Sequence, residues 1–259
     1  MEAPEMLNFF PFSAPSAAAP HRIRHIRKGG RAVKSAADSL ETEAFTAERE
    51  WVVEGIPVLT ARIALPEPVG PETRLKRRIR RYYRTQCRAY LRYCGRQLFP
   101  MAAAAYHAAL ASSAPLPCFR AELTYHVTCH EGGFWSLYTQ SQEPDDGGRT
   151  LLRRWGDTWD LRTGYPAALP SFFPPHSGWK KQLLHLAAGE IRQQEAAGHA
   201  RYLPGWQRKL RRNFNARNFY LTPEGLVFFY PMYAIAPAME GIPAFTVPWN
   251  RQQDETEPQ

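Results

Sequence analysis

The sequence contains no run of about 20 apolar residues, which is the length that a helix needs to cross a membrane. A secretory signal, in turn, needs basic residues followed by an unbroken apolar segment. The first residues, MEAPEMLNFFPFSAPSAAAP, instead contain acids and are interrupted by prolines. On these grounds the sequence predicts a protein without a membrane span that stays in the cytoplasm.

Cysteine is also scarce, with four residues and no CxxC pair. A chain of 259 residues can bury a large core without disulfides, so these cysteines need not form a disulfide framework. Cys87 and Cys94 are seven residues apart and would share the inner face of a helix. We therefore expect four small, buried, reduced thiols.

Motifs of known catalytic or cofactor chemistry are missing as well: there is no P-loop, GxSxG or dinucleotide fingerprint. His126 and His130 would lie on one face of a strand, but no third metal ligand accompanies them at a known spacing. Asp157 and Asp160 are expected to cap turns or to pair with one of the arginines Arg153, Arg154 and Arg162. The sequence therefore predicts a non-catalytic protein without a metal or cofactor.

Positive charge, by contrast, is abundant, since 33 Lys and Arg face 24 Asp and Glu and give a net charge of +9. Residues 72–99 predict a long amphipathic helix that starts near Pro71 and breaks or restarts at Pro100. Its apolar stripe is Leu75, Ile79, Tyr83, Cys87, Tyr90, Cys94 and Leu98. The opposite face is basic and could bind a polyanion such as nucleic acid through Arg77, Arg80, Arg81, Arg84 and Arg88.

The rest of the chain predicts mostly antiparallel strands with helices in its second half. Residues 55–68, 118–130, 134–142 and 149–161 have strand character, and glycine-containing turns join the last three into a meander. Residues 180–197 predict a helix, and a shorter one follows Pro204. The fold class is therefore α+β, with antiparallel sheet packed by the long basic helix and by one or two later helices.

The segment FYLTPEGLVFFYP predicts a hairpin with a tight turn at residues 223–225. Its second strand, Leu226 to Tyr230, is continuously apolar, which indicates cover on both faces. A stiff apolar loop follows, called here the C-terminal loop (residues 233–243). It is interpreted either as a lid over the core, with Gly241 at positive φ, or as a binding surface. Its candidate binding residues are Tyr233, Ile235, Pro237, Met239, Gly241 and Pro243.

The hairpin and loop resemble the C-terminal module of the anti-sigma factor RsiV, which also occurs beside polysaccharide deacetylase domains. The matching residues are Asn218, Phe219, Tyr220, Gly225, Tyr233, Ile235, Ala236, Pro237, Gly241, Ile242, Pro243 and Phe245. A weaker similarity includes Ser136-Leu137, Gly147-Gly148, residues 160–164 and residues 169–172, although Thr150 stands where that family has a histidine. The resemblance implies a bacterial, non-catalytic binding or sensing module with a protein or cell-wall ligand, and it implies an extracytoplasmic setting as the alternative location.

These patterns divide the chain into a disordered cationic tail (1–45), an N-terminal α+β lobe (46–165), the RsiV-like module (166–250) and a short disordered tail (251–259). The basic tail is interpreted as a solvated leader or as an arm that binds polyanions. Two functions follow as alternatives: a binding or sensing module that uses the C-terminal loop, or a cytosolic protein that binds polyanions through the basic helix and tail.

Overall fold

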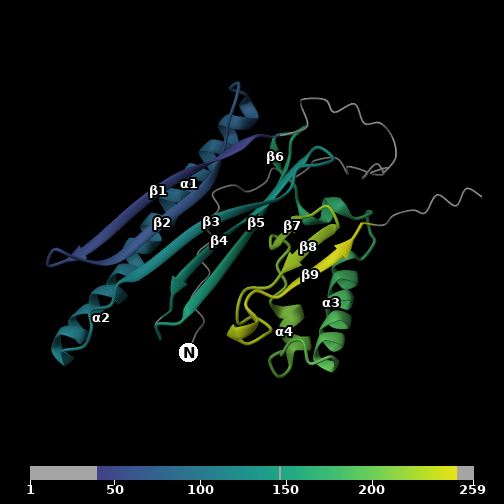
Figure 1. Ribbon diagram of the computed structural model, residues 1–259. Helices are drawn as coiled ribbons and strands as arrows, with labels where there is room; N and C mark the ends of the chain where they lie inside the picture. Colours follow the sequence, from purple (N-terminus) through teal and green to yellow (C-terminus); the bar gives the residue numbers. More distant parts are fainter. Residues whose placement is uncertain (1–39, 146, 250–259) are drawn as a thin grey trace, which may run out of the picture.

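The computed structural model describes residues 40–145 and 147–249, which form a six-stranded sheet and a three-stranded sheet (Figure 1). The first sheet has the order β1 (Thr42–Val53), β2 (Ile56–Pro68), β3 (Phe119–Cys129), β4 (Phe134–Pro144), β5 (Thr150–Asp160) and β6 (Tyr165–Pro166). The second consists of β7 (Phe219–Leu221), β8 (Gly225–Phe229) and β9 (Ala244–Pro248). All strand pairs are antiparallel except β2 with β3, which confirms the predicted α+β class.

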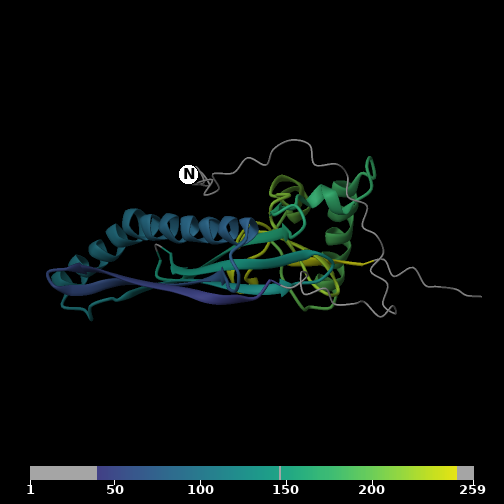
Figure 2. The same cartoon turned by 90° about the horizontal axis from the view of Figure 1, so that it is seen from above.

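The parallel pair is joined by a helical crossover that lies along one face of the six-stranded sheet (Figure 2). It consists of α1 (Arg74–Tyr93), a π-helical turn (Cys94–Leu98) and α2 (Phe99–Ser112). The predicted start at Pro71 was wrong: Thr73 caps the helix, and its Oγ1 accepts a hydrogen bond from the Lys76 amide at 3.2 Å. Pro100 does not interrupt the helical crossover, because it follows the π-helical turn and lies in the first turn of α2, where proline is tolerated.

The apolar stripe of the helix faces the sheet as predicted. Six of its seven members are buried, from Ile79 to Leu98, and Leu75 is partly buried. They pack on buried strand residues that include Leu59 and Leu123. Each such fully buried aliphatic side chain contributes about 1.5–3 kcal/mol, so this face holds α1 on the sheet.

The strands β2 to β5 confirm the predicted segments, whereas β1 was not predicted. Its sequence, TEAFTAEREWVV, mixes charged and apolar residues, and only part of it is covered by the sheet's core. Such a composition suits an edge strand, because charge on an edge discourages pairing with other chains. The proposed tails, 1–45 and 251–259, lie outside the described residues except for positions 40–45, of which Thr42 onward belongs to β1.

The second sheet packs with α3 (Trp179–Ala196) and α4 (Trp206–Arg212) (Figure 1). The bounds of both helices are close to those predicted from the sequence. Two 3-10 turns complete the described elements, at Leu169–Phe172 and Ala238–Glu240. All residues of β7 and β8 are buried, which confirms that the aromatic hairpin is covered on both faces.

The two sheets meet where β7 crosses β4 and β5. Leu221 N donates a hydrogen bond to Ser136 Oγ at 2.8 Å. At Gly156 the strands approach so closely that an added Cβ would lie 1.8 Å from Phe219 O. Because alternate residues of a strand face opposite sides, Ser136 and Gly156 lie on the face opposite to α1. The helical crossover therefore lies on one face of the six-stranded sheet, and the second sheet covers the part of the other face formed by β3, β4 and β5.

The four cysteines are free thiols, and three are buried as expected. Cys118 is exposed, which corrects the prediction, because it lies just before β3 starts at Phe119. Within residues 40–145 and 147–249, none of the helices has the length and apolar character required to span a bilayer.

Candidate functional site

The C-terminal loop is fixed against the segment that contains α4. The Leu203 amide donates to the carbonyl of Ile235 at 2.9 Å, and Asn213 Nδ2 donates to the carbonyl of Ala234 at 2.8 Å. The Ile235 side chain is completely buried and anchors the middle of the loop in the core. These contacts give the loop a defined conformation before any partner arrives.

The far end of the loop is held in the same way. Glu240 Oε1 accepts a hydrogen bond from the Arg201 amide at 3.0 Å. Gly241 then takes φ +66° and ψ −128°, a conformation that favours glycine and that confirms the expected positive φ. The amide of Tyr230 donates to the carbonyl of Pro243 at 2.8 Å, so the loop closes where β9 begins.

Of the six loop residues predicted to bind a ligand, two are well exposed. Met239 is 77% exposed, the largest value among the exposed large hydrophobic residues, and Tyr233 is 39% exposed at φ +66°. Ile235 and Pro243 are buried and therefore act as anchors rather than as contact residues. Pro237 and Gly241 are partly exposed.

Helix α4, which lies beside this loop (Figure 1), carries several cations. Arg208, Arg211 and Arg212 are exposed, and none of them forms an ion pair with a carboxylate of the described residues. The Leu210 carbonyl accepts a hydrogen bond from Tyr230 Oη at 3.0 Å, which ties the helix to the strand that leads into the loop. These contacts hold the loop and α4 together, and their exposed side chains are called here the docking surface: Tyr233, Met239, Arg208, Arg211 and Arg212.

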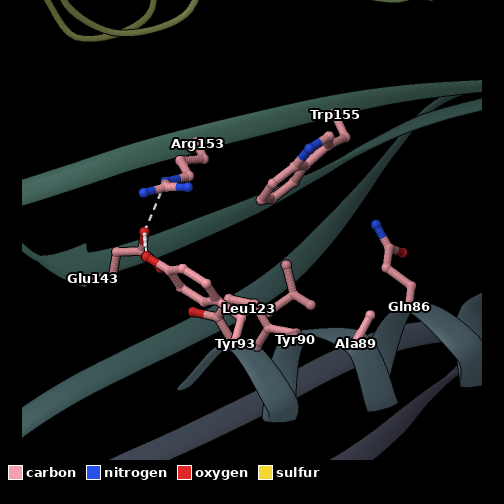
Figure 3. Close-up of a pocket in the computed structure, with 8 residues that line it drawn as sticks. All are labelled: Gln86, Ala89, Tyr90, Tyr93, Leu123, Glu143, Arg153 and Trp155. Carbon is pink, nitrogen blue, oxygen red and sulfur yellow. Dashed lines mark hydrogen bonds and ion pairs between the residues drawn. The ribbon is translucent and has the colours of Figure 1, made fainter. Parts of the chain in front are cut away.

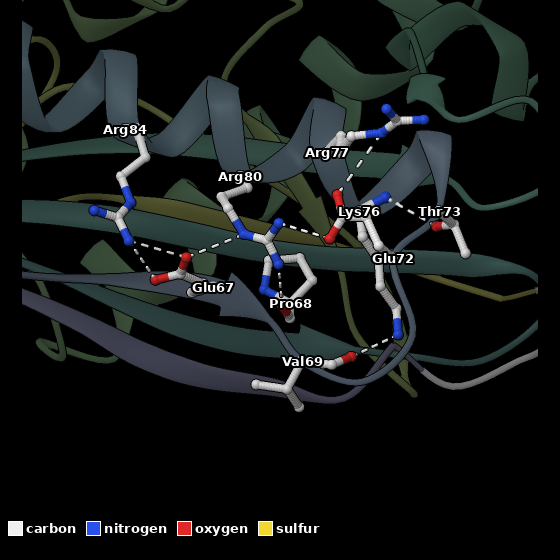
Figure 4. A network of polar contacts seen from close by, with 9 residues as sticks. All are labelled: Glu67, Pro68, Val69, Glu72, Thr73, Lys76, Arg77, Arg80 and Arg84. Carbon is white, nitrogen blue, oxygen red and sulfur yellow. Dashed lines mark hydrogen bonds and ion pairs between the residues drawn. The ribbon is translucent and has the colours of Figure 1, made fainter.

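The arginine face of α1 is largely engaged within the chain (Figure 4). Arg84 Nη2 contacts both carboxylate oxygens of Glu67 at 2.8 and 2.9 Å. Arg80 contacts Glu67 at 3.0 Å and Glu72 at 2.8 Å, and Arg77 lies 3.8 Å from Glu72. Three of the five arginines predicted to bind a polyanion, Arg77, Arg80 and Arg84, therefore have carboxylate partners. Arg81 and Arg88 are exposed on the same helix.

We expect Glu67→Gln to cost no more than about 1 kcal/mol of unfolding free energy, because the ion pairs it removes are solvent-accessible. The cost should shrink as salt is raised from 20 to 500 mM, since salt screens exposed charges. Urea unfolding at both salt concentrations measures it, with Glu131→Gln as a control at an exposed turn position. A salt-independent loss of several kcal/mol would contradict this description of the arginine face.

Between α1 and the sheet lies a buried carboxyl that sequence reasoning assigned wrongly. Asp157 was expected to cap a turn or to pair with arginine, but it accepts hydrogen bonds from Tyr82 Oη at 2.8 Å and Tyr83 Oη at 3.1 Å. Burial raises the pKa of Asp157 to about 6, and the two tyrosine hydroxyls act in the opposite direction. By contrast, Asp160 does pair with Arg162, at 3.3 Å.

A second buried carboxyl lies further along the same face of the sheet. Glu143 Oε1 contacts Arg153 Nε at 2.8 Å and accepts a hydrogen bond from Tyr93 Oη at 2.9 Å (Figure 3). Burial raises the pKa of Glu143, while the charge of Arg153 and the hydroxyl of Tyr93 favour the ionised form. Sequence analysis did not identify this site, because Glu143 and Tyr93 are 50 residues apart and are brought together only by the helical crossover.

The histidine pair suggested by the sequence does not form. A register shift between Val127 and Cys129 interrupts the alternation of β3, so His126 and His130 do not share a strand face as predicted. His126 instead lies against the ring of Tyr138, with 5.4 Å between ring centroids. In the part of the chain that the structure describes, no group of three or more His, Cys, Asp and Glu residues is arranged to hold a metal.

Comparison with known proteins relates this arrangement to a family without an assigned function. The model of the family described as "Protein of unknown function (DUF3298)" matches residues 170–250, which include α3, α4, the second sheet and the C-terminal loop. No curated protein matches the chain.

Two solved structures have a similar fold. A member of the DUF3298 family from Bacteroides fragilis NCTC 9343 is 16% identical, with a TM-score of 0.61, and the match covers 82% of this chain and 92% of that one. A DUF3298 family protein from Pseudomonas aeruginosa PAO1 is 18% identical, with a TM-score of 0.53 and coverage of 82% and 93%. At these identities the likeness shows a common fold that extends beyond the family segment into the six-stranded sheet.

Proposed function

We propose that this protein is a non-catalytic binding module and that the docking surface receives a protein partner. One observation carries the proposal: the C-terminal loop is anchored by buried Ile235 and by backbone hydrogen bonds, yet it presents Met239 and Tyr233 to solvent. A loop that is already ordered loses little conformational entropy when it binds. A side chain as exposed as Met239 contributes little to the fold itself.

The side chains of the docking surface indicate which kind of partner it would bind. Met239 offers a flexible, polarizable side chain that adapts to apolar partners. Arg208, Arg211 and Arg212 offer guanidinium groups, which bind carboxylates in bidentate geometry. The partner is therefore a protein segment that places an apolar side chain next to acidic ones.

The resemblance of the hairpin and loop to the RsiV module supports the same conclusion. In RsiV the module is a sensor that binds a protein, lysozyme. The matching residues include the exposed Tyr233 and the anchors Ile235 and Pro243, so the resemblance covers both the scaffold and part of the surface.

The proposal predicts that random peptides displayed on phage and selected on the whole protein will be rich in Asp and Glu beside an aliphatic or aromatic residue. Selected peptides should bind at least about tenfold more weakly to Met239→Asp, because a buried contact is replaced by a charge that repels acidic residues. Fluorescence anisotropy with a labelled peptide measures the affinities.

Leu110→Asp is the matched control, since Leu110 is an exposed apolar residue, 49% exposed, at the end of α2 far from the loop. It should leave peptide affinity unchanged. Peptides that bind Met239→Asp as tightly as the original protein would contradict the proposal. Binding that depends on Arg81 and Arg88 instead, and that falls steeply with salt, would favour the polyanion alternative.

A further inference from the structure

A pocket separate from the docking surface lies between α1 and strands β3 to β5 (Figure 3). It has an empty volume of about 410 Å³, which includes its opening to solvent, and its interior is narrow. Trp155 and Arg153 form the β5 side, and Tyr90 and Tyr93 come from α1. Gln86 and Glu143 lie toward opposite ends of the row of labelled side chains, so the space between them is elongated.

Unused hydrogen-bond acceptors collect in and beside this pocket. Glu143 Oε1 is engaged by Arg153 and Tyr93, whereas Glu143 Oε2 is buried with no donor at hydrogen-bonding distance, and the nearby hydroxyls of Tyr90 and Ser141 favour the ionised carboxylate only from further away. Gln86 donates through Nε2 to Thr139 at 3.1 Å, and its Oε1 is likewise buried without a partner. The Glu143 side chain is completely buried, and a buried carboxylate oxygen without a hydrogen bond costs free energy unless a ligand or water supplies a donor.

The strand beneath the pocket adds a buried hydroxyl, which can donate as well as accept a hydrogen bond. Ser141 precedes Glu143 by two residues on the same face of β4, and its Oγ is buried without a hydrogen bond. Three of the four such side-chain atoms among the described residues thus lie at this one place. Such a concentration is uncommon, because most buried polar groups of folded proteins are satisfied.

We propose that the pocket binds a small alkylammonium ligand, a primary amine on a short aliphatic chain. An ammonium group has three donors and no acceptor, which matches a pocket that has acceptors to spare. Its charge is attracted to the Glu143 carboxylate and to the faces of aromatic rings such as Trp155. The methylene groups lie against the apolar surface of Leu123 and Tyr90.

Other ligand classes fit the walls less well. An anion would bring further acceptors and would lie beside a carboxylate that is buried and already shares its Arg153 partner. A neutral alcohol supplies one donor and adds lone pairs of its own. Ordered water could satisfy the same atoms, and this alternative predicts no preference for amines.

The test is a titration of the whole protein with n-butylammonium chloride, followed by the indole N–H signal of Trp155 in ¹H–¹⁵N spectra. Trp155→Phe assigns that signal. n-Butanol and sodium butyrate are titrated at the same ionic strength as neutral and anionic counterparts of the same length. The proposal expects the Trp155 signal to shift with butylammonium at millimolar concentrations and to change little with the other two compounds.

Glu143→Gln keeps the size of the side chain and removes the charge, so it should weaken butylammonium binding about tenfold or more. Gln86→Met tests the other end of the pocket without touching the Glu143 ion pair and should weaken binding less. Glu48→Gln, on the exposed strand β1, should leave binding unchanged. A Trp155 signal that does not respond, or that responds equally to all three compounds, would overturn the proposal.

Discussion

Gly156→Val is expected to lower the melting temperature by roughly 6–12 °C, the largest effect predicted for a single substitution in this protein. The first added carbon would lie 1.8 Å from Phe219 O and 2.6 Å from Phe219 C, and both are backbone atoms that no side-chain rotation can move. The second sheet would have to withdraw from β4 and β5. Overpacking of this kind costs about 3 kcal/mol, and in a chain of this size each kcal/mol lowers the melting temperature by about 2–4 °C.

Gly189→Ala provides the matched control for this prediction. Gly189 lies inside α3, and an added Cβ there would meet no atom within 4 Å. Alanine has a higher helix propensity than glycine, so this variant should be as stable as the original protein or up to about 1 kcal/mol more stable. If Gly156→Val melted at the same temperature as Gly189→Ala, the described packing of the two sheets would be wrong.

Asp157→Asn is expected to remove a pH dependence of stability that the natural residue creates. The pKa of Asp157 rises from 3.8 to about 6 on folding, so between these values the folded state holds a proton that the unfolded state has lost. Stability from this group therefore falls as pH rises from 4 to 6 and stays low above 6. Since one pKa unit corresponds to about 1.4 kcal/mol, the total cost of the buried charge is at most about 3 kcal/mol.

Urea unfolding at pH 5, 6, 7 and 8 measures the effect as the difference between the two proteins. The unfolding free energy of Asp157→Asn minus that of the original protein should increase by about 1–1.5 kcal/mol from pH 5 to pH 7. The change with pH is decisive, because the amide also alters the hydrogen bonds with Tyr82 and Tyr83 at every pH.

The tyrosine hydroxyls provide the complementary variant. The double variant Tyr82→Phe/Tyr83→Phe removes both hydroxyl donors that Asp157 uses. The loss of stability from pH 5 to pH 8 should therefore be larger in this variant than in the original protein. Identical pH profiles for the original protein and Asp157→Asn would contradict the assignment of a raised pKa to this carboxyl.

Local sequence patterns were sufficient to predict most of the scaffold. The spacing of Ile79, Tyr83 and Cys87 marked the buried face of α1, and apolar runs between glycine turns marked β4, β5 and β8. These features are determined by residues close together in the chain. The edge strand β1 was missed because its charged residues obscure the alternation that identifies a half-buried strand.

The buried polar residues between α1 and the sheet could not be predicted in this way. Ser141 and Glu143 alternate with Gln140 and Gln142, so the pattern does not say which face of β4 is buried. The answer depends on the tyrosines and Gln86 of α1, which the crossover places above the strand. Buried carboxyls with tyrosine partners are tertiary features, and only the fold reveals them.

The basic face of α1 illustrates the opposite error. Its arginines predicted a polyanion-binding surface because charge is visible in the sequence while its partners are not. Glu67 lies near the end of β2 and Glu72 precedes α1, so the turn between them brings Glu67 to Arg80 and Arg84 and brings Glu72 to Arg80. Arg208, Arg211 and Arg212 of α4 are exposed without a carboxylate partner among the described residues, and Arg88 of α1 shares this property.

The most direct test of the docking surface is the NMR signal of the Met239 methyl group during titration with a selected acidic peptide. Selective methyl labelling of methionine and the variant Met239→Leu assign the signal, and Met101 of α2, which packs against the core of the six-stranded sheet, serves as an internal reference. We predict that the Met239 methyl signal shifts in proportion to peptide binding while that of Met101 does not. A peptide that binds without moving the Met239 signal would contradict the proposed function.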